Sequence, residues 1–312
     1  MTRYDVVVLG DVNMDYVVHN LPFRLSDLVD NGLVDWEEID ELPGGSGLNF
    51  CTFAAAAGYS CLLLGKAGND SDGLAITTWL RARDIAIPRQ WTTTAPTGKA
   101  FILRDSAGIR LIINNRHNAN HSLSAVDVEE YSAALASCRV LNISGYCISS
   151  PRTARYHAAL RAMALARSCP RPAVVVFDVV PHRIYEQMTF EQFRECTRHV
   201  DILISEVATM RRFLSLGSRS EAIDEPMARD TAERMSAYYS RFALRYGSSG
   251  CDLEILTDVN GGRFAHHATG HDQAHDKRGY GDRLALSALR DFFHVLPPTA
   301  AASSGPVRAG GS

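Results

Sequence analysis

The sequence has no strong excess of one charge. Lys and Arg number 32 against 35 Asp and Glu, a net charge of −3 over 312 residues. A charge this small creates no field that would collect nucleic acid or anionic lipid. We therefore expect small-molecule chemistry, with no nucleic-acid partner and no membrane partner.

Long apolar runs and cysteine motifs are also missing. No window holds about 18 consecutive apolar residues, the length that a membrane span needs. The apolar run at 6–9 is too short for the core of a signal peptide. The seven cysteines are an odd number without C-x-x-C spacing, which favours reduced thiols over a disulfide framework or a zinc module. These absences predict a soluble, cytoplasmic protein.

The composition, with 46% hydrophobic and 21% charged residues, is that of a folded globular protein. Short apolar runs without alternation, which are typical of buried parallel strands, are separated by helical patterns. Strands are expected at 6–9, 62–64, 140–143, 174–177 and 202–204, and helices at 48–57, 71–83, 153–167 and 190–199. This alternation predicts an α/β fold with a doubly wound, mainly parallel sheet.

Two strand pairs interrupt the alternation. Residues 99–105 and 109–115 flank a short polar turn with a glycine, so we expect an antiparallel hairpin there. Residues 12–43 lack a helical period, and the two regions together predict a small β lid built from about 12–43 and 97–117. A second hairpin is expected at 253–257 and 263–267, and the Pro-, Ser- and Gly-rich tail at 297–312 is expected to be disordered.

A glycine-rich loop at 43–49 precedes a predicted helix. Gly44 and Gly45 allow a ligand to approach the backbone, and Asn49 offers a donor and an acceptor to hydroxyl groups. A glycine-rich loop that only starts a helix fits this pattern equally well.

Polar residues follow the first predicted strand, at the sheet edge where ligands bind in open α/β folds. Asp11 and Asp15 are suited to hold the hydroxyl groups of a polyol, with Asn13 between them. Asp11 and Asn13 fit equally well as residues that cap a turn.

A third glycine-containing segment, Gly279-Tyr280-Gly281-Asp282, precedes an amphipathic helix. The amides at a helix N-terminus converge on one point, where an anion such as a transferring phosphoryl group is stabilised. Asp282 beside that point is placed to accept a proton from an attacking hydroxyl. The alternative is that Asp282 is only the N-cap of the helix.

Two further groups of residues have side chains of types that bind ligands. Four histidines at 266–275 lie on a polar segment without fixed i,i+4 spacing, so no metal site is predicted. Tyr16 and Trp36 could stack on a sugar or a base, although packing within the lid is the favoured interpretation.

Five motifs occur in the order and spacing of the ribokinase-like (PfkB) carbohydrate kinases, and the sequence resembles that family from Tyr4 to Phe293. The motifs are residues 10–15 (GDVNMD), 43–49 (PGGSGLN), 65–73 (GKAGNDSDG), 96–100 (PTGKA) and 279–282 (GYGD). The resemblance implies one ribokinase-like kinase domain over 1–296. It also implies transfer of a phosphoryl group from ATP, with Mg²⁺, to a hydroxymethyl group of a sugar, nucleoside or sugar-like metabolite. A homodimer through the lid is implied as well.

The resemblance also assigns roles to residues. Asp282 is expected to be the catalytic base, and the amides of Gly279, Tyr280 and Gly281 the anion hole. The residues expected to contact acceptor hydroxyls are Asp11, Asn13, Asp15, Gly44, Gly45 and Asn49. The residues expected on the nucleotide side, in a turn at 245–250 and after the strand at 202–204, are Arg245, Gly247, Gly250 and Glu206.

The donor side departs from the family pattern. Arg245 replaces the usual Thr. In the family, the motif Asn-x-x-Glu organises Mg²⁺ and phosphate. In this sequence Glu206 stands in place of the Asn, and Thr209 stands in place of the Glu. Fewer elements follow the helix after Asp282 than in the family, where they form part of the adenine pocket. A second hypothesis is therefore a non-catalytic ligand-binding or regulatory protein with the kinase fold. Retention of Asp282 and both glycines favours the enzyme.

Overall fold

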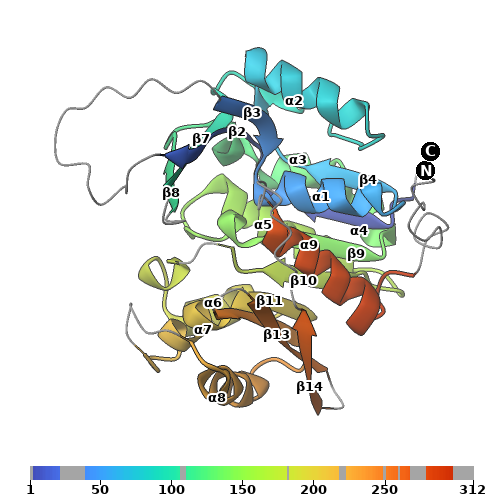
Figure 1. Cartoon of the computed structure of the whole chain (residues 1–312). Coiled ribbons are helices and arrows are strands. Elements are labelled where there is room, and N and C mark those ends of the chain that lie inside the picture. The colour runs from blue at the N-terminus through green and yellow to red at the C-terminus, as the bar shows by residue number, and fades with distance from the viewer. Residues whose placement is uncertain are drawn as a thin grey trace, which may run out of the picture.

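A central sheet of eight strands organises the computed structural model, which describes residues 3–21, 39–105, 110–180, 183–217, 223–248, 251–258, 261–267 and 279–297 (Figure 1). The strand order is β14-β13-β12-β11-β10-β9-β1-β4. The strands from β4 through β12 run parallel, and β13 and β14 are antiparallel. Their bounds are β1 (Val6–Leu9), β4 (Cys61–Leu64), β9 (Val140–Ser144), β10 (Val174–Asp178), β11 (Ile202–Glu206), β12 (Phe242–Ser248), β13 (Cys251–Asp258) and β14 (Gly261–His267).

Helices cover both faces of this sheet, because successive side chains of a strand point to opposite faces. In β1, Val7 and Leu9 pack in one core and Val6 and Val8 in another, and all four are fully buried. The first core contains residues of α3 (Ala125–Glu129), α4 (Ser132–Ser137), α5 (Ala154–Arg167), α6 (Phe190–Cys196), α7 (Val207–Phe213) and α8 (Glu225–Ser236). The second contains residues of α1 (Ser46–Ala56), α2 (Ser71–Arg81) and α9 (Tyr280–Ser287). The predicted doubly wound α/β sheet is confirmed.

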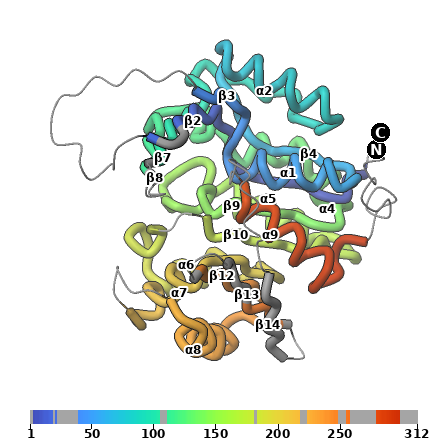
Figure 2. The backbone as a smooth tube through the Cα atoms, in the orientation of Figure 1, coloured from blue at the N-terminus to red at the C-terminus, as the bar shows by residue number. Residues whose placement is uncertain are grey.

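Helices α1 and α9 lie side by side although they come from opposite ends of the sequence (Figure 2). Both bury apolar side chains on the same face of the sheet, such as Leu48 of α1 and Ala285 of α9. This pairing brings the loop at 43–49 close to the segment at 279–282.

The lid is a four-stranded sheet in the order β3-β2-β7-β8. Its strands are β2 (Asn13–Leu21), β3 (Ile39–Gly44), β7 (Gly98–Asp105) and β8 (Arg110–Asn114). The expected hairpin is confirmed by the antiparallel pairing of β7 with β8, and residues 22–38 and 106–109 of the expected lid lie outside the described residues. Tyr16 stacks on Phe101 with ring centroids 5.0 Å apart, and its hydroxyl donates to Asp72, so it packs within the lid as favoured. Trp36 lies outside the described residues.

Several elements differ from the sequence-based expectations. The helix expected at 190–199 ends at Cys196, and the sequence patterns did not predict β12, α3, α4, α7 or α8. Helix α7 follows β11 without a loop, since Glu206 ends the strand and is also the N-cap of the helix. The second hairpin is confirmed by the pairing of β13 with β14. Residues 298–312, His271 and His275 lie outside the described residues.

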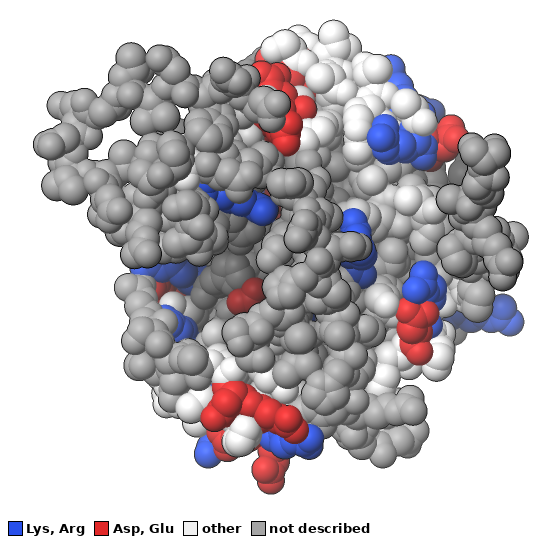
Figure 3. All heavy atoms as spheres, viewed as in Figure 1, with Lys and Arg blue, Asp and Glu red and all other residues white. Residues whose placement is uncertain are grey.

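The described surface mixes both signs of charge. On the face shown in Figure 3, Lys and Arg atoms are interspersed with Asp and Glu atoms. Within the described ranges, the side chains offer no group of three or more His, Cys, Asp or Glu that could hold a metal ion. No helix in the described part of the chain has the length and apolarity needed to cross a membrane.

Asp70 links two of the five motifs at the base of the lid. Its carboxylate accepts hydrogen bonds from the Gly73 amide at the start of α2 (2.9 Å) and from the Thr97 amide (2.8 Å) and hydroxyl (2.5 Å). Burial raises the pKa of Asp70, but the hydrogen bonds from Thr97 and Gly73 outweigh burial and the net pKa is lowered.

We predict that Asp70→Ala lowers the free energy of unfolding by about 1–2 kcal/mol, because it removes a helix cap and the Thr97 contacts. A lowered carboxyl pKa stabilises the fold above the unfolded pKa, near 3.8, and this stabilisation is lost as the pH falls through the folded pKa. Urea unfolding at pH 7 and pH 3 measures the difference, with the exposed Glu233→Ala as control. An equal deficit at both pH values would contradict the ionic part of the argument.

Candidate active site

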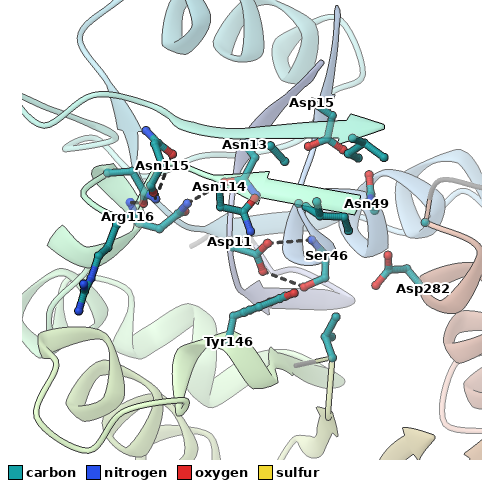
Figure 4. Close-up of a pocket in the computed structure, with 18 of the residues that line it drawn as sticks. Asp11, Asn13, Asp15, Ser46, Asn49, Asn114, Asn115, Arg116, Tyr146 and Asp282 are labelled. Atoms are coloured by element: carbon teal, nitrogen blue, oxygen red, sulfur yellow. Dashed lines mark hydrogen bonds between the residues drawn. The ribbon is translucent and has the colours of Figure 1, made fainter. Parts of the chain in front are cut away.

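A cavity of about 430 Å³ lies between the lid and the carboxyl end of the central sheet (Figure 4). Its lining includes apolar side chains of the lid strands β7 and β8, such as Ile102 and Ile112. It brings together most of the predicted acceptor residues with the predicted base, and these are Asp11, Asn13, Asp15, Gly45, Asn49, Gly279 and Asp282. The remaining predicted acceptor residue, Gly44, ends β3 beside them.

Asp11 holds the start of α1. Its carboxylate accepts hydrogen bonds from the Ser46 amide (3.0 Å), the Ser46 hydroxyl (2.7 Å) and the Ser144 hydroxyl (3.0 Å). Its backbone carbonyl accepts from the Leu48 amide at 3.2 Å. Asp11 therefore holds a helix start 35 residues away in the sequence, which neither interpretation predicted, and contact with an acceptor stays a prediction.

Gly44 and Gly45 of the loop at 43–49 lie so close to Asp15 and Asp11 that neither position has room for a side chain. A Cβ on Gly44 would lie 2.1 Å from the Asp15 carboxylate, which occupies the space beside it. Gly45 has φ = 95° and a Cβ there would lie 2.7 Å from the Asp11 carbonyl oxygen. Side chains at either position would displace the buried carboxylates at the acceptor end of the cavity.

Asn13 is oriented by Asn120, which the sequence analysis did not single out. The buried Asn120 side chain accepts from the Val12 amide (2.8 Å) and donates to the Val12 carbonyl (3.0 Å) and to Asn13 Oδ1 (3.0 Å). Because Asn13 Oδ1 accepts this hydrogen bond, the side-chain NH₂ group of Asn13 is oriented to donate to a ligand. No motif identifies Asn120, because its partners are more than 100 residues away.

Asp282 is buried in the first turn of α9, with 9% of its surface exposed. Gly279, with φ = 59°, is the N-cap of α9, so the alternative that Asp282 is the N-cap is wrong. Burial raises the pKa of Asp282 well above its usual value, the charge of Asp178 raises it further, and Arg245 and the polar contact with Asn49 act in the opposite direction. The described residues supply no side-chain cap for the N-terminus of α9. An uncapped helix start next to a buried carboxylate can stabilise an anion and receive a proton.

Asp178 is a site residue that the sequence analysis missed. It ends β10, is 3% exposed, and accepts a hydrogen bond from Arg245 Nη2 at 3.0 Å. Arg245 Nη1 donates to the Gly281 carbonyl at 2.6 Å, so this arginine ties β12 to the first turn of α9. The available signal was an acidic residue directly after the apolar run at 174–177, at the edge of the sheet where ligands bind.

The nucleotide side differs from the predicted turn at 245–250. Arg245 and Gly247 lie in β12, which continues to Ser248 because it pairs with β13 as a hairpin. Gly250 lies outside the described residues. Glu206 is opposite Arg245 in the pairing of β11 with β12. Of the four predicted nucleotide-side residues, the structure therefore brings Arg245 and Glu206 to the edge where Asp282 lies.

Known proteins resemble this chain over different lengths. The Bifunctional protein HldE of Ectopseudomonas mendocina (strain ymp) is 30% identical over 151 residues, which is 47% of this chain. The match spans only 31% of the length of that relative.

Solved structures share the fold over nearly the whole chain. The adenosine kinase from Sinorhizobium meliloti superposes with a TM-score of 0.77 at 18% identity, covering 96% of this chain and 90% of that one. The ribokinase from Cryptococcus neoformans var. grubii serotype A in complex with ADP has a TM-score of 0.69 at 18% identity, covering 93% and 88%. A chain from E. coli assigned as a ribokinase II, in complex with ATP and Mg²⁺, also has a TM-score of 0.69 at 18% identity, covering 94% and 89%. These likenesses confirm the ribokinase-like fold.

The family model described as pfkB family carbohydrate kinase matches residues 3–252. This range contains four of the five motifs and ends before the segment at 279–282. The chain therefore belongs to the pfkB family of carbohydrate kinases.

Proposed function

We propose that this chain transfers the γ-phosphoryl group of ATP to a hydroxymethyl group of a sugar, nucleoside or sugar-like metabolite. The observation that carries the proposal is the buried carboxylate of Asp282, which lines one cavity with Asn13, Asp15 and Asn49. A carboxylate with a raised pKa is a stronger base than an exposed one, as removal of a hydroxyl proton requires. Family membership and the ATP and Mg²⁺ held by the E. coli relative support the choice of donor and ion.

The acceptor is bound by the polar groups around Asp282. Asp15 and the Asn13 amide hydrogen-bond acceptor hydroxyls, and Asn49 orients both the reacting hydroxyl and Asp282. Asp282 then accepts the proton of that hydroxyl as its oxygen attacks phosphorus. Gly44 and Gly45 leave room for the Asp15 carboxylate and the Asp11 backbone, so that Asp15 can face the acceptor.

The donor phosphates lie at the N-terminus of α9. The amides of Tyr280 and Gly281 stabilise the charge of the transferring group, and Arg245 is fixed beside them through the Gly281 carbonyl. Mg²⁺ takes oxygen ligands and usually needs only one or two carboxylates, and Glu206 and Asp178 would hold it from the ends of neighbouring strands. The bound ion neutralises phosphate charge.

We predict that Asp282→Asn separates activity from stability. Removal of the proton acceptor should lower kcat by about 10²–10⁴-fold. The same variant should unfold at a higher temperature at pH 7, because the fold disfavours the buried charge. A carboxyl pKa raised in the fold destabilises above the unfolded pKa, near 3.8, so this gain should vanish at pH 3.

The measurement uses an acceptor screen of sugars and nucleosides with ATP and Mg²⁺, followed by thermal unfolding of both proteins. Turnover near that of the wild type would exclude Asp282 as the base. Ligand binding without turnover in the wild-type protein would favour the binding-protein hypothesis.

Arg245 should set the pH dependence of the base. Its positive charge lowers the pKa of Asp282, so Arg245→Gln should raise that pKa. Because Asp282 must be unprotonated to act, the acidic limb of the kcat profile should move to higher pH. Arg241→Gln just before β12, where Arg241 donates to the Phe293 carbonyl, is the matched control and should not move it. An unshifted profile in Arg245→Gln would refute the coupling.

The free thiols of the described cysteines support our proposal that the protein is cytoplasmic. We also propose that a second copy of this chain binds the outer face of the lid. Ile102 lines the cavity, so its neighbours Phe101 and Ile113, which pair with each other, face away from it. They are 45% and 51% exposed, and Leu111 and Ile39 are exposed with them.

Ile113→Lys should therefore convert a dimer into a monomer, since a charge in an apolar interface loses its hydration. Light scattering after size exclusion measures the mass. Val126→Lys on α3, which is 72% exposed outside the lid, should have no effect. A monomeric wild-type protein would refute this interface.

A further inference from the structure

Arg155 is a buried cation on the wall of the acceptor cavity. Only 7% of its surface is exposed, and its Nε atom has no hydrogen-bond partner. Among the residues that the structure describes, no carboxylate forms an ion pair with Arg155. Because arginine keeps its proton at any relevant pH, it cannot escape the cost of burial by becoming neutral. A buried, uncompensated arginine indicates that an anion occupies this place in the working protein.

The helix that carries Arg155 adds to the same positive potential. Arg155 is the second residue of α5, whose N-terminus is capped by the hydroxyl of Thr153. A helix N-terminus favours negative charge, yet the first turn of α5 contains no acidic residue. The side-chain charge and the helix dipole therefore both attract an anion to one point of the cavity.

Other cationic and polar side chains line the same cavity. Arg104 of β7 and Arg116, which follows β8, are among the lining residues, and so is His121. Burial lowers the pKa of His121, and the positive charge of Arg155 lowers it further, so these two groups interact across the cavity wall.

The carboxylates of the cavity have partners other than Arg155. Asp11 accepts three hydrogen bonds from Ser46 and Ser144, and Asp282 lies against Asn49. In Figure 4, Arg116 and Asp282 are at opposite ends of the pocket. The cavity is thus polarised, with the reacting end acidic and the far end cationic.

We propose that the acceptor carries an anionic group, a phosphate monoester or a carboxylate, at the end opposite its reacting hydroxymethyl group, and that Arg155 binds this anion. The planar guanidinium can donate two parallel hydrogen bonds to either oxyanion. This proposal rests on the proposed function, because it takes the ligand whose anion binds Arg155 to be the phosphoryl acceptor.

Binding of matched sugars without nucleotide tests the proposal by calorimetry. The probes are fructose, fructose 6-phosphate and gluconate, because each of the two anions has a hydroxymethyl group at the end opposite its charge. We expect wild-type protein to bind at least one anion about 10–100-fold more tightly than fructose. Phosphate and carboxylate are distinguished by which of the two anions binds more tightly.

Variants of Arg155 assign the effect to this residue. Arg155→Gln should abolish the preference for the anion while leaving the affinity for fructose unchanged, and Arg155→Lys should restore part of it. Arg161→Gln, two turns later on the exposed side of α5, is the matched control and should retain the full preference. Inorganic phosphate should also raise the unfolding temperature of the wild type more than that of Arg155→Gln.

Three outcomes would overturn the proposal. They are equal affinity for fructose and both anions, equal loss of neutral and anionic ligands in Arg155→Gln, and identical stabilisation of both proteins by phosphate. If the anion binds through Arg155 but ATP and Mg²⁺ give no turnover, the kinase function is wrong and the anion site stands.

Discussion

Contact between two glycines, Gly10 and Gly47, fixes the position of everything around the cavity. A Cβ on Gly10 would lie 2.5 Å from the Cα of Gly47, so the turn after β1 and the first turn of α1 touch backbone to backbone. Because of this contact, the Asp11 carboxylate can accept a hydrogen bond from the first residue of α1. Asn49 lies in the first turn of the same helix, where its backbone amide donates to the Gly45 carbonyl. Asn49 then faces α9, which packs on α1 from the other end of the chain. Acceptor residues and the base are thereby held on one rigid framework.

The charges gathered at α9 are costly to the fold. Asp178 and Asp282 are both buried. The Arg245 guanidinium pairs with Asp178, and its positive charge also lowers the pKa of Asp282. In a medium less polar than water, unlike charges attract and like charges repel more strongly than at the surface. A fold selected for stability alone would place an apolar or amide side chain at 282. The arrangement makes sense where a strong base and a fixed cation are both needed beside a phosphoryl group.

The sequence could predict the framework because its signals are local. Short apolar runs such as 6–9 and 174–177 identified the parallel strands, and the glycine motifs identified the acceptor end and Asp282. The missed residues act through distant partners: Asn120 bonds to Val12, and Asp178 meets Arg245. Neither pair has a spacing that a local pattern could show. Likewise β12 pairs with β11 as far as Arg245 and continues beyond it to Ser248 by pairing with β13, so a strand stands where a turn was expected.

The polarity of the cavity also limits how an anionic acceptor can be oriented. With its anion at Arg155, such a ligand presents the opposite end to Asp282. A reversed ligand would place its negative charge near Asp282, Asp178 and Asp15, where repulsion from buried carboxylates is strong. The same carboxylates tolerate neutral hydroxyls, which can donate hydrogen bonds to them. Discrimination between the two ends of the acceptor therefore comes from repulsion at the reacting end as much as from attraction at the far end.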